Sequence, residues 1–298
     1  MLNKIIYTIL GIGIALVFFP HGTKETKRTE AISGISIQKT DNVKPAPELA
    51  SNVPAPQLTA KAAVAYDLDS KTILYSRNLD EKLPIASLTK LMTALIISHH
   101  ANPDSVVVVG KTENNVVGAS MGLVEGERIT VGSLLQGLLI SSSNDAALAL
   151  GDFEAGSTDR FAELMNEQAV ALGLNNTHFA NPVGWDSDEN YSNALDLIKI
   201  TEEFLKSDKL RQIAKTKETL VSSTDGKYTH ELHTTNKLLL DNPEVEGIKT
   251  GFTSKALGNL IILTNHDGNQ ILTVVLGSEN REDDTQKLLD WLLEVYKW

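Results

Sequence analysis

The sequence contains no cysteine among its 298 residues. This absence excludes disulfide bonds, zinc and iron–sulfur sites built on thiolates, and a cysteine nucleophile. It leaves the compartment open, because an exported protein can do without cysteine. Basic residues are also in deficit, with 27 Lys and Arg against 38 Asp and Glu and a formal net charge of -11. Because phosphate contacts need a basic face, this balance argues against binding to nucleic acid.

One apolar run stands at the N-terminus, after Lys4, and covers residues 5–19. Its length fits the apolar region of a signal peptide, since about 22 Å of helix is short for a hydrocarbon core of about 30 Å. No cleavage site of small residues follows promptly. The run therefore predicts export, with residues 1–19 acting either as an uncleaved membrane anchor or as a cleaved signal peptide.

A polar segment with spaced prolines follows at residues 20–57. Its scarcity of large apolar residues predicts a disordered linker, because such a composition cannot build a core. Residues 58–298 are then expected to form one acidic domain that is large enough to bury a core.

Strands are predicted at both ends of this domain, at residues 62–66, 72–75, 260–264 and 271–276. Between them the chain from Ile85 to about Leu205 has a mostly helical pattern, and a last helix is predicted from about Asp283 to Tyr296. Strands at both ends with helices between them predict an α/β fold of the α+β type. In this fold one sheet is assembled from both ends of the domain, and a helical part is inserted.

Ser87 and Lys90 lie three residues apart at a predicted helix start, so their side chains share one face. A serine needs a base to become a nucleophile, and a partly desolvated lysine can serve as that base. The spacing alone is a weak signal, because Ser36 and Lys39 repeat it within the predicted linker. A helix N-cap with an incidental lysine is the alternative for Ser87.

A second polar group, with Ser142 and Asn144, interrupts an otherwise apolar helical stretch. These side chains either cap a helix or line a cleft. The segment predicts a site only in combination with other motifs.

A third group, Lys249, Thr250 and Gly251, occurs once in the chain. The glycine lets a ligand approach the backbone, and the ammonium and hydroxyl groups suit an anion such as a carboxylate. The alternative is a turn at a strand end with a surface lysine.

Taken together and in this order, the three groups resemble the signature set of penicillin-binding proteins and serine β-lactamases. Within that set the chain resembles the low-molecular-mass penicillin-binding proteins that are D-alanyl-D-alanine carboxypeptidases. The resemblance runs from about residue 58 to 298 and is carried by residues 119–123, 134–139, 142–147, 179–184, 191–194 and 247–254. It implies a β-lactamase/transpeptidase-like fold, with an antiparallel sheet, flanking helices and an inserted helical subdomain.

The resemblance also implies a mechanism. Ser87 would attack the carbonyl between the last two D-alanines of a peptidoglycan stem peptide and form an acyl-enzyme, while Lys90 takes its proton. Ser142 would relay a proton to the leaving amine, and Asn144 would hold Lys90 and the substrate backbone. Water would then release the shortened peptide. β-Lactams would be covalent inhibitors, and no metal or organic cofactor is implied.

On the substrate-binding side, the resemblance implies that Lys249 and Thr250, followed by Gly251, face the terminal carboxylate. The backbone N–H groups of Ser87 and Phe252 would form an oxyanion hole. Arg281 would lie near the carboxylate. The implied location is outside the cytoplasm, tethered to the membrane by the N-terminal segment or secreted if that segment is cleaved.

Two residues depart from the family pattern. Ser143 stands where many relatives have glycine and is expected to crowd the cleft, and Val183 stands where some relatives have histidine.

Two other functions remain as alternatives. A class A-like β-lactamase would need a glutamate in the region of residues 177–188, which has none. A catalytically inactive, wall-tethered scaffold would bind penicillin-like ligands without chemistry, and the intact motifs argue against it.

Two further patterns are predicted not to be sites. Residues 118–122 match the Gly-x-Ser-x-Gly nucleophile elbow but lack the long buried strand that this turn requires. Residues 230–233 lack the spacing of a zinc-binding helix and are predicted to be a solvated polar loop.

Overall fold

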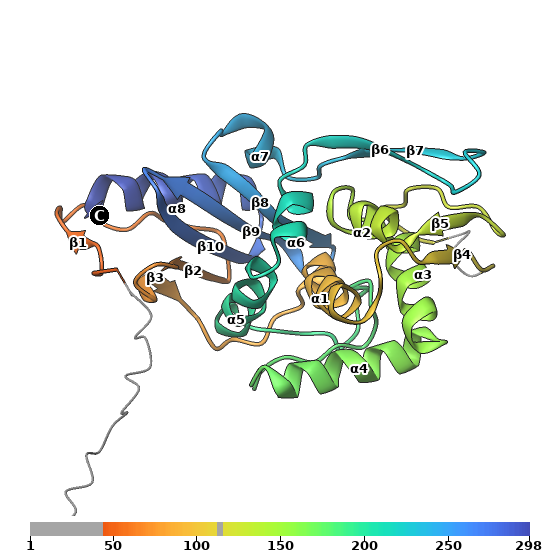
Figure 1. The fold of residues 1–298 in the computed structure, drawn as a ribbon. Helices are drawn as coiled ribbons and strands as arrows, with labels where there is room; N and C mark the ends of the chain where they lie inside the picture. The colour runs from red at the N-terminus through yellow and green to blue at the C-terminus, as the bar shows by residue number, and fades with distance from the viewer. Residues whose placement is uncertain (1–43, 112–115) are drawn as a thin grey trace, which may run out of the picture. The chain divides into compact units, whose positions relative to one another are not determined.

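The computed structural model describes residues 44–111 and 116–298. Five strands form one antiparallel sheet in the order β3-β2-β10-β9-β8 (Figure 1). These strands are β2 (Ala62–Asp67), β3 (Thr72–Arg77), β8 (Val245–Thr253), β9 (Leu257–His266) and β10 (Asn269–Ser278). Because β2 pairs with β10, the beginning and the end of the domain meet inside the sheet. The prediction of one sheet built from both ends is confirmed.

Both faces of β2 are buried, which explains its continuous apolar sequence. Side chains alternate along a strand. Ala63 and Ala65 therefore face helix α8 (Arg281–Val295), together with its Leu288 and Leu292. Val64 belongs to the larger core on the other face, among the remaining helices. The sheet is thus a central layer with helices on both sides.

The inserted part is helical, as predicted (Figure 1). Its elements are η1 (Ala86–Thr89), α1 (Lys90–His100), α2 (Val131–Leu139), α3 (Asn144–Ala155), α4 (Thr158–Ala171), α5 (Ala194–Leu205) and α6 (Asp208–Ala214), and α7 (Lys237–Asp241) follows nearer to β8. Helix α1 contacts α2, α3, α4 and α5, so it is the centre of this part. Its residues from Lys90 to Ile97 are all buried.

The segment of residues 140–143, which contains three consecutive serines, divides the apolar stretch into the two helices α2 and α3. Ser142 has a φ of 59°, in the left-handed region that non-glycine residues rarely adopt. At this turn the two neighbouring serines have different partners, since Ser142 Oγ contacts Lys249 and Ser143 Oγ contacts Ser141.

Two small hairpins complete the helical side. One pairs β4 (Val106–Val108) with β5 (Arg128–Thr130), and the other pairs β6 (Glu218–Ser222) with β7 (Thr229–His233). The prediction of a solvated loop at residues 230–233 is therefore wrong, because His230 and Leu232 are buried on β7 while their neighbours are exposed. The two hairpins lie beside each other, and Thr224 N–H donates to the carbonyl of Arg128.

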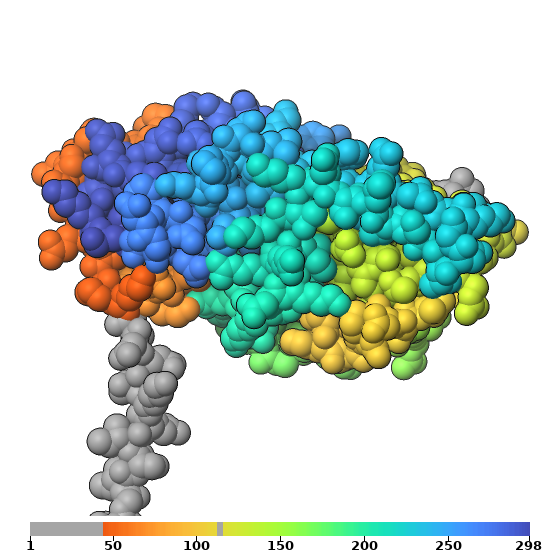
Figure 2. Space-filling model, turned by 45° about the horizontal axis from the view of Figure 1, so that its top comes forward, coloured from red at the N-terminus to blue at the C-terminus, as the bar shows by residue number. Residues whose placement is uncertain are grey.

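The structure also differs from the prediction at the end of the 20–57 segment. Strand β1 (Glu48–Leu49) pairs with β11 (Tyr296–Lys297), and Trp291 Nε1 donates to the carbonyl of Val53 at 2.9 Å. Figure 2 shows this N-terminal segment against the C-terminal part of the chain. From Lys44 onward the segment is therefore packed on the domain rather than free.

The predicted anchor at residues 1–19 lies outside the described residues, as does the linker before residue 44. Within residues 44–111 and 116–298, no helix is both long enough and apolar enough to cross a membrane. The division into anchor, linker and domain otherwise stays a prediction.

Candidate active site

Lys90 and Ser87 lie one helical turn apart at the junction of η1 and α1. The Lys90 amine lies 2.9 Å from Ser87 Oγ, and it donates to Asn144 Oδ1 at 2.8 Å and to the Val183 carbonyl at 2.7 Å. Ile85 and Thr89 hold the cap positions before η1 and α1, so the N-cap alternative for Ser87 does not apply.

The environment of Lys90 disfavours its charge. Complete burial, followed by the charge of Lys249, lowers the pKa of Lys90 well below its ordinary value, against the opposing effect of Asp145. A neutral amine has two hydrogens and one lone pair. The two pure acceptors, Asn144 Oδ1 and the Val183 carbonyl, take the hydrogens, so the lone pair faces Ser87 Oγ. Lys90 is thus placed to accept the hydroxyl proton.

Lys249 forms a second buried lysine–serine pair. It lies within the edge strand β8, and its amine donates to Ser142 Oγ at 2.7 Å and to the Thr250 carbonyl at 2.9 Å. The alternative of a surface lysine at a turn is excluded, since Lys249 is buried. Burial, followed by the charge of Arg281, lowers the pKa of Lys249 to about 7.

Asn144 connects the first pair to the segment that precedes it in the sequence. Its Nδ2 donates to the Val117 carbonyl and its backbone N–H to the Ala119 carbonyl, both at 2.7 Å. Ser143 stands at the cap position of α3 without a capping hydrogen bond from its side chain. Instead its Oγ bonds Ser141 Oγ at 2.8 Å and is buried. The expected crowding of the cleft by Ser143 is not seen, because this buried side chain is not among the residues that line the cavity described next.

A cavity of about 320 Å³ unites the three motifs. Its wall includes Ser87, Ser142, Asn144, Thr250, Gly251 and Arg281. Lys90 and Lys249 lie behind this wall and meet the cavity through their two serines. The arrangement offers a serine with an adjacent base, a second serine beside an amine, and cationic groups for an anion.

Two glycines allow close approach to the backbone of Ser87. A Cβ on Gly251 would lie 2.9 Å from the Ile85 carbonyl and 3.1 Å from Ser87 N. A Cβ on Gly184, whose φ is +93°, would lie 2.0 Å from the Ala86 carbonyl. The sequence predicted that Gly251 lets a ligand approach the backbone. In the structure, the chain's own 85–87 segment also lies where a side chain at this position would be.

Arg281 begins α8, and its Nη1 donates to the Gly251 carbonyl at 2.9 Å. The guanidinium group therefore lies beside the third motif, and its role near a carboxylate stays a prediction. Phe252 lies on the rim of the same cavity, with a side chain that is 67% exposed.

Three residues of the cavity wall lie outside every motif and segment singled out from the sequence, namely Val117, Trp185 and Thr235. Thr235 Oγ1 bonds Thr250 Oγ1, and Trp185 is 38% exposed on the rim. Trp185 could have been found from the sequence, because it is an aromatic residue that directly follows the 179–184 segment. Thr235 had no such signal, because it belongs to no motif.

Other candidate centres carry no comparable chemistry. Ser120 Oγ donates to Asp145 Oδ2 at 2.6 Å in a loop, so the nucleophile elbow is absent there. A larger cavity of about 510 Å³, lined in part by Tyr66, Lys199 and Arg211, has no serine in its wall. In the part of the chain that the structure describes, no three His, Asp or Glu residues gather as metal ligands.

A family model described as D-alanyl-D-alanine carboxypeptidase matches residues 49–280. The chain belongs to this family. Among curated members, the D-alanyl-D-alanine carboxypeptidase DacF of Bacillus subtilis is 35% identical over 247 residues, which are 80% of this chain and 63% of that protein. DacA of Escherichia coli is 35% identical over 252 residues, 79% of this chain and 61% of that protein. The chain thus spans less than two thirds of the length of these two members.

Solved structures of the family confirm the predicted fold. The crystal structure of the Streptomyces K15 DD-transpeptidase superimposes with a TM-score of 0.77 at 30% identity, over 82% of this chain and 100% of that chain. The D-alanyl-D-alanine carboxypeptidase DacD of Francisella tularensis gives a TM-score of 0.76 at 25% identity, over 83% and 73%.

Proposed function

We propose that the protein is a serine-type D-alanyl-D-alanine carboxypeptidase that removes the terminal D-alanine from peptidoglycan stem peptides. One observation carries the proposal. The buried Lys90 amine, with its pKa lowered, contacts Ser87 Oγ in the wall of a cavity that also holds Ser142, Thr250 and Arg281. The family and the names of its members support the substrate class.

In the acylation step, Ser87 Oγ bonds to the carbonyl carbon of the penultimate D-alanine and passes its proton to Lys90. The carbonyl oxygen becomes an oxyanion, which the N–H groups of Ser87 and Phe252 stabilise by about 3–4 kcal/mol each. The C–N bond then breaks as the proton taken up by Lys90 passes by way of Ser142 to the leaving amine, so that D-alanine departs and Lys90 is neutral again. Water hydrolyses the acyl-enzyme and regenerates Ser87.

The terminal carboxylate of the substrate binds beside Lys249, Thr250 and Arg281. Two cationic groups with one hydroxyl form a site for an anion in a partly desolvated cavity, where charge pairing is stronger than in water. This recognition favours removal of the last residue over cleavage inside a peptide.

β-Lactams carry a carboxylate and a reactive amide, so they acylate the same serine as covalent inhibitors. Peptidoglycan lies outside the cytoplasmic membrane, and the apolar run at residues 5–19 supports export to that side. Tethering by residues 1–19, or secretion after cleavage, stays a prediction.

The test is acylation of the full chain by benzylpenicillin, followed by intact mass and peptide mapping. We expect one penicilloyl group on Ser87, which Ser87→Ala abolishes while the protein stays folded. Release of D-alanine from a peptide ending in D-Ala-D-Ala then identifies the reaction. Because one similar structure is named a DD-transpeptidase, an added amine acceptor distinguishes hydrolysis from transfer.

Two results contradict the proposal. Rapid loss of the adduct as hydrolysed penicillin favours the β-lactamase alternative. Absence of any adduct on folded protein favours the inactive scaffold.

A further inference from the structure

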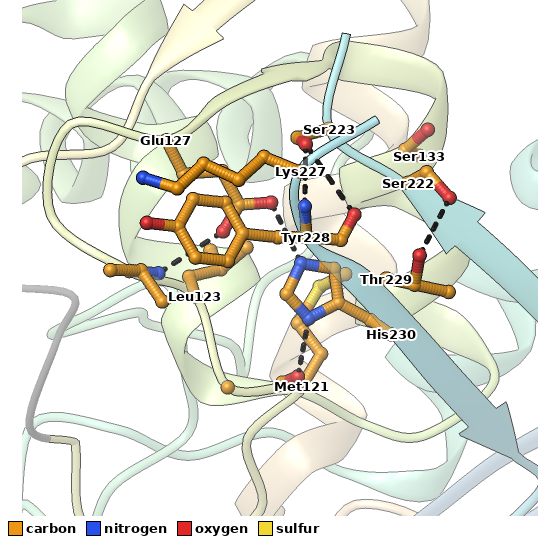
Figure 3. Close-up of polar contacts among 12 residues, drawn as sticks. Met121, Leu123, Glu127, Ser133, Ser222, Ser223, Lys227, Tyr228, Thr229 and His230 are labelled. Atoms are coloured by element: carbon orange, nitrogen blue, oxygen red, sulfur yellow. Dashed lines mark hydrogen bonds and ion pairs between the residues drawn. The ribbon is translucent and has the colours of Figure 1, made fainter. Parts of the chain in front are cut away.

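Glu127 and His230 form a buried pair that the proposed mechanism does not use (Figure 3). His230 Nε2 lies 2.7 Å from Glu127 Oε1, and His230 Nδ1 lies 2.9 Å from the Met121 carbonyl. The two side chains are 5% and 0% exposed for His230 and Glu127 respectively. Glu127 Oε2 also accepts the backbone N–H of Val124 at 3.1 Å.

The partners of His230 determine where its hydrogens are. A carbonyl oxygen only accepts, so Nδ1 carries a hydrogen and donates it to Met121. Nε2 faces the carboxylate of Glu127 and forms the second hydrogen bond of the imidazole ring. The pair therefore joins β7 to both ends of the 121–127 segment.

The segment before Glu127 is held from a second side by Asp145. The Asp145 carboxylate accepts the backbone N–H groups of Met121, Gly122 and Leu123, as well as the Ser120 hydroxyl. We call residues 117–123 the cleft loop, because Val117, Gly118 and Ala119 line the cavity. The cleft loop is thus fixed between Asp145 and the Glu127–His230 pair.

The cleft loop in turn holds the motif that orients the base. The Val117 carbonyl accepts the side-chain Nδ2–H of Asn144, and the Ala119 carbonyl accepts its backbone N–H. Asn144 Oδ1 accepts a hydrogen from Lys90 at 2.8 Å. A shift of the cleft loop would therefore move Asn144 and redirect the lone pair of Lys90 away from Ser87.

We propose that Glu127 and His230 are positioning residues for the acylation of Ser87, acting through the cleft loop, Asn144 and Lys90. The inference rests on the proposed function, because it assigns these residues to the same reaction. A pair that only stabilised the β6–β7 hairpin would affect unfolding and leave the chemistry unchanged.

The experiment compares three variants of the full chain that break the pair in different places. His230→Gln keeps a donor for Glu127 and loses the contact with Met121, whereas His230→Asn keeps a donor for Met121 and is too short for Glu127. Glu127→Gln changes only the charge and one hydrogen-bonding group. His233→Gln is the matched control, since it makes the same change three residues along the same strand at an exposed position.

Acylation by benzylpenicillin is measured at several concentrations, which separates the dissociation constant of the first complex from the limiting rate constant. We expect the limiting rate constant to fall on the order of tenfold in the Glu127 and His230 variants, because misplacement of a reacting group slows chemistry. The dissociation constant should stay nearly unchanged, because Lys249 and Arg281 are untouched. His233→Gln should match the wild type in both.

The outcomes separate this inference from the proposed function. If folded variants unfold at a lower temperature but keep the wild-type limiting rate constant, the inference is overturned while the proposed function stands. If His230→Gln does not fold, Glu127→Gln decides, because it preserves the shape of the side chain. A wild-type protein that is not acylated overturns the proposed function and this inference with it.

Discussion

Each of the two buried lysines contacts one serine, but the proposed chemistry needs them in opposite charge states. Lys90 must be neutral to accept the Ser87 proton, and burial, with the neighbouring charge of Lys249, lowers its pKa in that direction. Lys249 must be charged to bind a carboxylate, although burial lowers its pKa to about 7. The pH range in which Lys90 is neutral and Lys249 is charged therefore ends, on the alkaline side, near the pKa of Lys249.

This boundary gives a prediction for the pH dependence of acylation. As pH rises through about 7, Lys249 loses its proton in the free enzyme, so the second-order rate constant for benzylpenicillin should fall. Lys249→Arg should remove this alkaline decrease, because a guanidinium group stays protonated. Pre-steady-state acylation between about pH 6 and about pH 9 measures both profiles. A variant that keeps the same decrease would assign it to another group.

At this scale the sequence indicated which residues come together for the proposed reaction but not their surroundings. The spacing of Ser87 and Lys90 follows from helical geometry, so the contact between them could be foreseen. The orientation of Ser143 could not, because it depends on the left-handed φ of Ser142. The Glu127–His230 pair could not either, since it joins residues from two hairpins whose pairing no motif indicates.

Among the elements, β8 and η1 pack closely together beside Ser87, and Gly251 permits this contact because it has no side chain. Gly251→Ala would place a Cβ 2.9 Å from the Ile85 carbonyl and 3.1 Å from Ser87 N, and backbone atoms cannot give way cheaply. We expect acylation to slow by at least about tenfold, because the strand and the nucleophile must separate.

Gly151→Ala is the matched control for this prediction. Gly151 lies in α3, where a new Cβ would meet Phe161 at 3.4–3.5 Å, an ordinary contact. Alanine should stabilise this helix by about 0.5–1 kcal/mol and leave acylation unchanged. Urea unfolding and benzylpenicillin kinetics on both variants provide the measurement. Equal acylation rates in the two variants would contradict the packing role of Gly251.

The elements that the sequence predicted well are those with strong apolar patterns. Strands β9 and β10 and helix α8 were found because their buried residues are periodic or continuous. The β6–β7 hairpin was missed because β6 buries only Val221 and β7 only two residues. Such a hairpin is held by its contacts with β5 and the cleft loop rather than by its own pattern.

For the whole molecule, the segment from Lys44 to about residue 57 acts as part of the domain. It contributes the β1–β11 pairing, the Trp291–Val53 hydrogen bond and an ion pair of Lys44 with Asp69. A chain shortened to residues 58–298 should therefore unfold at a lower temperature than one shortened to residues 44–298. Thermal unfolding of both chains, with benzylpenicillin acylation as the check on folding, tests this. Equal unfolding temperatures would return the segment to the role of a linker.

The strand order of the sheet also determines when the site can form during synthesis of the protein. Ser87 leaves the ribosome long before β8, β9 and β10. Strand β2 can pair with β3 early, but its other edge pairs only when β10 has arrived. Contacts between distant parts of a chain form late in folding. A growing chain therefore carries Ser87 without Lys249, Thr250 and Arg281, the groups proposed to bind a carboxylate. Penicillin labelling of Ser87 should thus count finished molecules only, and its onset would mark the moment at which the two ends of the domain join.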